Sequence, residues 1–96
     1  MAARKFQSNR ELFDYLVQLS DILRSKGEAD LADQVFRASR FASGSPSEFL
    51  HEAETALRTV RRNCVDRSTI LDEGELEQAS SAIRQIQIAF MEIGGA

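Results

Sequence analysis

The chain has 96 residues, which is enough for one domain with one hydrophobic core and too few for two. Hydrophobic residues make up 43% and charged residues 28%, an ordinary globular composition that argues against intrinsic disorder. The formal net charge is -3, whereas a general nucleic-acid-binding protein usually carries a positive balance. One proline and five glycines are too few for the many tight turns of an all-β chain. We therefore expect a single all-α domain over residues 1–96.

The sequence predicts neither a signal peptide nor a membrane span. Its first five residues include Arg4 and Lys5, but no apolar run follows them. No segment approaches the roughly 20 apolar residues of a membrane-spanning helix. The single cysteine, Cys64, excludes an internal disulfide framework and fits a reducing compartment. We expect a soluble cytoplasmic protein that does not bind membranes.

The first helix is predicted over residues 9–26. Ser8 and Glu11 have the spacing of a capping box, in which the side chain of each residue satisfies a backbone N–H of the first turn. The central apolar stripe consists of leucines at steps of three and four: Leu12, Leu16, Leu19 and Leu23. Apolar residues cover more than half of the helix circumference, so this helix should lie deepest. Gly27 follows two cations and ends the helix.

The second helix is predicted over residues 28–43 and begins almost at once. Such a short connection favours an antiparallel helical hairpin. The predicted core face comprises Leu31, Ala32, Val35, Ser39 and Ala42. Phe41 lies about 140° from that stripe at 100° per residue, so the stripe does not account for it.

The third helix is predicted over residues 46–64. Pro46 suits the first helical position because its missing N–H has no intrahelical partner there, and Ser45 and Glu48 can form another capping box. The predicted core face comprises Phe49, Leu50, Ala53, Leu57, Val60 and Cys64.

A connection over residues 65–72 leads to the fourth helix, predicted over residues 73–93. Ile70 and Leu71 are expected to pack under the helices, and Asp72 with Glu75 offers a further capping box. The fourth helix carries an apolar seam at alternating steps of three and four: Leu76, Ala79, Ile83, Ile86, Phe90 and Ile93. The short connections favour an up-down-up-down four-helix bundle, with an orthogonal four-helix array as the alternative.

The sequence predicts no catalytic, metal or cofactor site. His51 falls opposite the core face of its helix, and Cys64 falls on the apolar side, where a cysteine is normally a small core residue. One histidine and one cysteine thirteen positions apart lack the ligand spacing of zinc, and a helical di-iron site needs two Glu-x-x-His motifs. No phosphate-binding loop or nucleophile motif is present. We therefore predict that the protein is not an enzyme, with an enzyme centred on His51 or Cys64 as the alternative.

Arginine accounts for ten of the twelve basic residues. Five arginines of the second and third helices could converge into a patch that binds a carboxylate or phosphate: Arg37, Arg40, Arg58, Arg61 and Arg62. The favoured reading is that they form surface ion pairs with nearby acids, each contributing roughly 0–1 kcal/mol.

Three large apolar residues do not fit the predicted core faces. Ile88 points about 170° and Met91 about 110° away from the seam of the fourth helix, and Phe41 is the third misfit. If these side chains gather, they form a candidate partner surface for another protein or a second copy of the chain. The alternative is that Ile88 and Met91 pack under residues 1–7 and 65–71.

The function predicted from the sequence is therefore a small helical protein-binding protein of unspecified role that can self-associate through its fourth helix. The first alternative is an anion- or nucleic-acid-binding module that uses the five arginines, although we do not expect nucleic acid as a partner. Another alternative is a prokaryotic immunity or toxin-neutralising protein, by analogy with small acidic helical proteins.

Overall fold

Four α-helices and one 3-10 turn form the described part of the chain. The computed structural model describes residues 6–66 and 70–94. In order, the elements are α1 (Asn9–Ser25), α2 (Ala29–Ser39), the 3-10 turn η1 (Arg40–Ser43), α3 (Pro46–Asp66) and α4 (Glu73–Gly94). These residues contain no strand, so the predicted all-α class is confirmed over the ranges that the structure describes.

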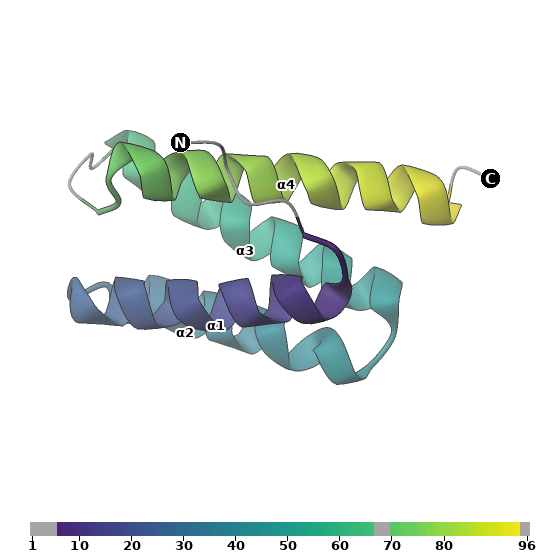
Figure 1. Cartoon of the computed structure of the whole chain (residues 1–96). Helices are drawn as coiled ribbons and strands as arrows, with labels where there is room; N and C mark the ends of the chain where they lie inside the picture. Colours follow the sequence, from purple (N-terminus) through teal and green to yellow (C-terminus); the bar gives the residue numbers. More distant parts are fainter. Residues whose placement is uncertain (1–5, 67–69, 95–96) are drawn as a thin grey trace.

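The α1–α2 hairpin turns on a single glycine. Gly27 has a φ of 80°, a left-handed conformation that glycine adopts without a steric penalty. The Gly27 N–H donates to Arg24 O at 3.1 Å, and the Glu28 N–H donates to Leu23 O at 2.9 Å. This pair of bonds is the Schellman arrangement, which satisfies the last carbonyls of a helix. The predicted reversal of direction at Gly27 is confirmed (Figure 1).

The end of the second helix differs from the prediction. After Ser39 the α-helix tightens into η1, so the constant 100° per residue that placed Phe41 outside the core no longer applies. Phe41 packs half-buried against the core, whereas Ala42 is exposed. The expectation that Ala42 faces the core was therefore wrong, because the regular helix ends before it.

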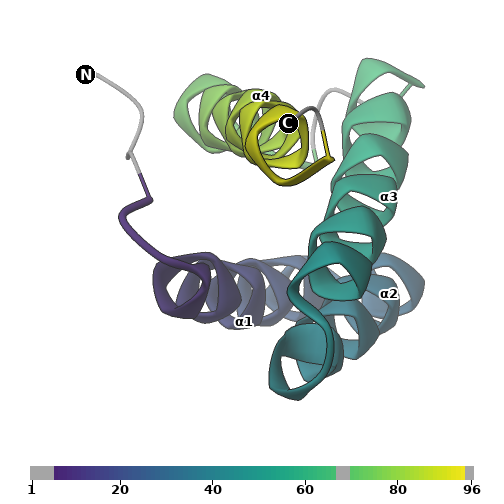
Figure 2. The same ribbon diagram turned by 90° about the vertical axis from the view of Figure 1, so that its right-hand side faces the viewer.

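The helices pack in sequence order, α1 against α2, α2 against α3 and α3 against α4. Successive helices run in alternating directions, and α3 crosses obliquely between the other helices (Figure 1). The second view shows α4 beside α3 and across from α1, so the α1 and α4 backbones approach each other less closely (Figure 2). α4 is thus supported mainly from one side.

The core is built from the predicted faces. In α4 the buried residues are Ala79, Ala82, Ile83 and Ile86, while Leu76 and Phe90 are half-buried at the edge. Ile70 and Leu71 are buried beneath the helices, as predicted. The predicted capping box at the start of α4 is also confirmed, since the Glu75 N–H donates to Asp72 Oδ1 at 2.7 Å and the Asp72 N–H donates to Glu75 Oε1 at 3.0 Å.

Candidate functional site

The surface of α4 that points away from the core carries two exposed apolar side chains. Ile88 is 56% exposed and Met91 is 72% exposed. Arg84 and Glu92 are also exposed, and at 100° per residue they lie about 40° on either side of Ile88. We refer to Arg84, Ile88, Met91 and Glu92 as the α4 outer face.

The segment before α1 bridges α1 and α4 next to this face. The Phe6 N–H donates to Gln85 Oε1 at 2.8 Å, and Gln85 Nε2 donates to Ser81 Oγ at 3.0 Å. The Phe6 ring lies against the Tyr15 ring of α1, with the ring centroids 5.4 Å apart. One side of α4 is therefore joined to α1 by a short segment of chain rather than by close helix packing (Figure 2).

A cavity of about 330 Å³ lies between this segment, α1 and α4, and we call it the α1–α4 cavity. Its lining is mixed, with apolar side chains from Phe6, Leu12, Leu50, Ile86, Ile88 and Ala89 and polar residues Gln7, Ser8, Asn9, Gln85 and Glu92. Ile88 thus forms part of the cavity wall while more than half of it remains exposed. The alternative prediction placed Ile88 under residues 1–7, and the structure shows only that Phe6, Gln7 and Ile88 line the same cavity. Residues 1–5 and 67–69 lie outside the described ranges.

Tyr15 is the most unusual polar group near the cavity. The residue is 7% exposed, and among the described residues its hydroxyl has no hydrogen-bond partner. Burial raises the pKa of Tyr15 well above its ordinary value, and the nearby carboxylate of Glu75 raises it further. The contact that covers the Tyr15 ring comes from Phe6, which lies outside the helices.

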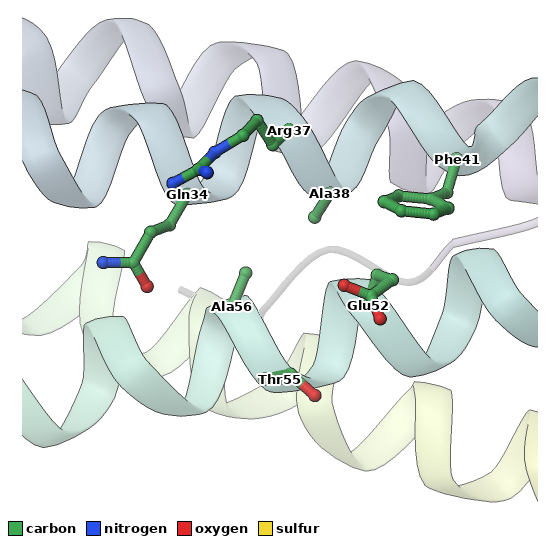
Figure 3. A pocket seen from close by; sticks show the side chains of 7 residues that line it. All are labelled: Gln34, Arg37, Ala38, Phe41, Glu52, Thr55 and Ala56. Atoms are coloured by element: carbon green, nitrogen blue, oxygen red, sulfur yellow. The ribbon is translucent and has the colours of Figure 1, made fainter.

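Phe41 does not join the other two predicted surface residues. It lines a separate cavity of about 330 Å³ between α2 and α3, together with Arg37 and Glu52. In the close view, the Phe41 ring and the Glu52 carboxylate lie at one end of this groove, and Arg37 and Gln34 lie at the other (Figure 3). Of the predicted partner surface, the structure keeps only Ile88 and Met91 on one helix.

The structure distributes the five predicted arginines over several surfaces. Arg37 Nε donates to the Asp33 carbonyl at 3.4 Å beside the α2–α3 cavity. Arg58 donates from Nε and from its terminal NH2 nitrogen to Glu54 Oε2, at 3.1 and 2.9 Å, and Glu54 also accepts from Gln87 of α4.

Arg40 lines a third cavity, between α1 and η1, which also includes Arg10 and Phe13. Arg61 is half-buried and Arg62 is exposed on α3. The arginines thus border different grooves.

The structure also locates the residues of the other candidate sites. His51 is exposed and Cys64 is buried, which are the positions expected from the sequence. Within residues 6–66 and 70–94, no group of three or more His, Cys, Asp or Glu side chains is arranged to hold a metal ion. None of the helices in these ranges combines the length and apolar content needed to cross a bilayer. Comparisons with models of known protein families, with curated proteins and with solved structures found no match.

Proposed function

We propose that this chain is a small protein-binding module that contacts another protein chain through the α4 outer face. The observation that carries the proposal is the exposure of Ile88 and Met91 on a helix whose opposite side is buried. A single exposed apolar side chain is common on protein surfaces, but two on one helix face beside a cavity form a patch of the kind that marks partner surfaces.

The composition of the face supports this role. Arg84 and Glu92 flank the apolar residues, which matches the usual arrangement of an apolar interface centre with a polar rim. The α1–α4 cavity next to Ile88 offers a recess for a partner side chain. Buried side chains in such recesses contribute most of the binding energy in many interfaces.

We also infer an up-down-up-down bundle as the scaffold of this face, with the orthogonal array as the alternative. The support for it is the alternation of helix directions along the chain (Figure 1). α4 packs mainly against α3, so one of its faces is open to a partner.

An anion-binding role has less support. Arg58 is engaged by Glu54, and Arg37 and Arg40 border different cavities. A phosphate or carboxylate site draws its strength from bidentate donors that converge on one point. The net charge of -3 adds a further electrostatic disadvantage for polyanions.

A matched pair of surface variants tests the proposed function. Ile88→Glu places a charge in the α4 outer face, whereas Val65→Glu places the same charge on an apolar side chain that is 77% exposed near the end of α3. Solution mass and capture of partner proteins would be measured for the native chain and both variants. We expect binding to be lost in Ile88→Glu and kept in Val65→Glu. Equal behaviour of the two variants, or no binding by the native chain, would contradict the proposal.

A further inference from the structure

We infer that the protein bound by the α4 outer face is a second copy of this chain, with the two α4 helices antiparallel and a two-fold axis passing beside Ile88. This inference rests on the proposed function and names the partner. Homodimers with two-fold symmetry use one patch twice, so every contact must be complementary to itself. The α4 outer face meets that requirement in the positions of its charges.

The charges of the face are arranged symmetrically about Ile88. In an antiparallel pair with its axis at residue 88, a residue four positions before Ile88 faces the residue four positions after it on the other chain. Arg84 therefore faces Glu92 of the second copy, and the symmetry repeats this opposite-charge contact. Both side chains are exposed, and among the described residues neither forms an ion pair within its own chain.

The same charges disfavour the parallel arrangement. In a parallel pair Arg84 would face Arg84 and Glu92 would face Glu92, so both contacts would be repulsive. Like charges placed against each other act against the wrong geometry even where the favourable pairs contribute little affinity. The direction of pairing thus follows from the positions of two residues.

The apolar residues complement one another in the same register. Ile88 meets Ile88 at the axis. Met91 lies on the flank of Ile88 away from the α1–α4 cavity, and the two-fold axis keeps it on that flank, beside Arg84 of the other chain. Each Met91, which is 72% exposed in the single chain, can thus pack along the aliphatic part of the other copy's Arg84.

The contact is short, which limits its strength. From Arg84 to Glu92 the helix axis advances only about 12 Å. Stable complexes usually bury about 1,200–2,000 Å² in total, and one helix pair of this length buries less. We therefore expect a weak dimer that is detected by sedimentation between about 10 µM and about 1 mM chain.

Charge reversal tests the register. Arg84→Glu and Glu92→Arg each convert both cross-chain contacts into like-charge contacts, so dimerisation at low salt should weaken about tenfold in either variant. The double variant Arg84→Glu with Glu92→Arg restores opposite charges only in the antiparallel pair, and its dimerisation should return to within about threefold of the native chain. A double variant that stays as weak as the single variants would overturn the antiparallel register.

Cross-linking provides an independent readout. In a Cys64→Ala background, Ile88→Cys should form a cross-linked dimer with a short bis-maleimide reagent, because the two cysteines meet at the axis. Glu77→Cys, an exposed position on the same helix, is the matched control and should remain monomeric. A mixture of Arg84→Cys and Glu92→Cys chains should cross-link, whereas Arg84→Cys alone should not.

The outcomes separate this inference from the proposed function. A native chain that stays monomeric at all concentrations, together with no cross-link from Ile88→Cys, overturns the second copy as partner. If Ile88→Glu then still abolishes capture of a different protein while Val65→Glu does not, the α4 outer face remains a binding surface for that protein. If neither variant changes dimerisation or the capture of another protein, both the inference and the proposed function are wrong.

Discussion

α1 and α4 are both long amphipathic helices, but they differ in what covers them. The leucines of the α1 stripe are at most 3% exposed, because α2, the rest of the core and the segment before α1 enclose them. α4 buries Ile83 and Ile86 to the same degree but leaves Ile88 and Met91 mostly exposed. The apolar content of a helix therefore does not show how many of its faces are buried within the chain. The proposed contact with a second chain would cover the outer apolar residues of α4.

Truncating one side chain in α1 and one in α4 should give the largest difference in the free energy of unfolding. Leu16→Ala removes a fully buried side chain of α1 and should lower the free energy of unfolding by about 2–5 kcal/mol, from lost burial and the cavity left behind. Ile88→Ala should change it by less than about 0.5 kcal/mol at concentrations where the chain is monomeric. Urea unfolding measures both. A comparable loss in Ile88→Ala would show that the α4 outer face supports the fold itself.

At alkaline pH we expect a loss of folding stability of intermediate size, caused by Tyr15 at the contact between α1 and α4. Because the pKa of Tyr15 is raised above its ordinary value of 10.0, the unfolded chain loses this proton first as the pH rises. The stability linked to Tyr15 is complete below about pH 10 and falls by about 1.4 kcal/mol per pH unit above it. Since Tyr15 is the only tyrosine and the chain has no tryptophan, phenolate absorbance reports this group alone.

Phe6→Ala sharpens this prediction by uncovering Tyr15. The variant should lower the pKa of Tyr15 towards its ordinary value, because the ring 5.4 Å away no longer excludes water. Phe36→Ala is the control, since Phe36 is 45% exposed on α2 and should leave the titration unchanged. An unchanged Tyr15 titration in Phe6→Ala would show that the segment before α1 does not cover this seam.

The first turns of the two helices should differ by a smaller amount. Asp72 accepts the Glu75 N–H at 2.7 Å, whereas Ser8 accepts the Glu11 N–H at 3.4 Å in the weaker cap of α1. We expect Asp72→Ala to lower stability by about 1–2 kcal/mol and Ser8→Ala by about 0.5 kcal/mol. Thermal unfolding distinguishes the two values, and the reverse order would refute the ranking.

The smallest expected effect belongs to the ion pair that joins the end of α1 to the start of α4. Lys26 Nζ lies 2.9 Å from Glu75 Oε1, and both side chains remain partly exposed. A double-mutant cycle with Lys26→Ala and Glu75→Ala should give a coupling of about 0.2–1 kcal/mol that decreases with salt. The cycle is needed because Glu75 also accepts the Asp72 N–H. A coupling that does not depend on salt would argue against an electrostatic link.

Several features of the fold were predictable because they depend on neighbours in the sequence. The box formed by Asp72 and Glu75 and the glycine turn at Gly27 each use residues within one turn of a helix. The outer position of Ile88 also follows from helical periodicity alone. The symmetric placement of Arg84 and Glu92 about Ile88 follows from their spacing of four residues on either side.

Other features required contacts between distant residues. Helical periodicity could not reveal that the helix would tighten after Ser39, and it therefore misplaced Phe41 and Ala42. Arg37 of α2 lies on one side of α3, and Arg58 of α3 points to the other. This arrangement depends on how α2 and α4 pack against α3. The contact of Phe6 with Tyr15 joins a non-helical residue to a helix, and no periodic pattern marks such a pair.

The sequence by itself determined that the described residues form four amphipathic helices and, up to Ser39 in the second of them, which side of each helix is apolar. These properties follow from hydrogen bonds and side-chain spacing within a few residues. Only the tertiary structure decided that α4 has a neighbour mainly on one side, that a cavity lies beside Ile88, and that Tyr15 is covered by Phe6. Those outcomes depend on the directions in which whole helices pack, and packing directions are set by the shapes of all contacting side chains together.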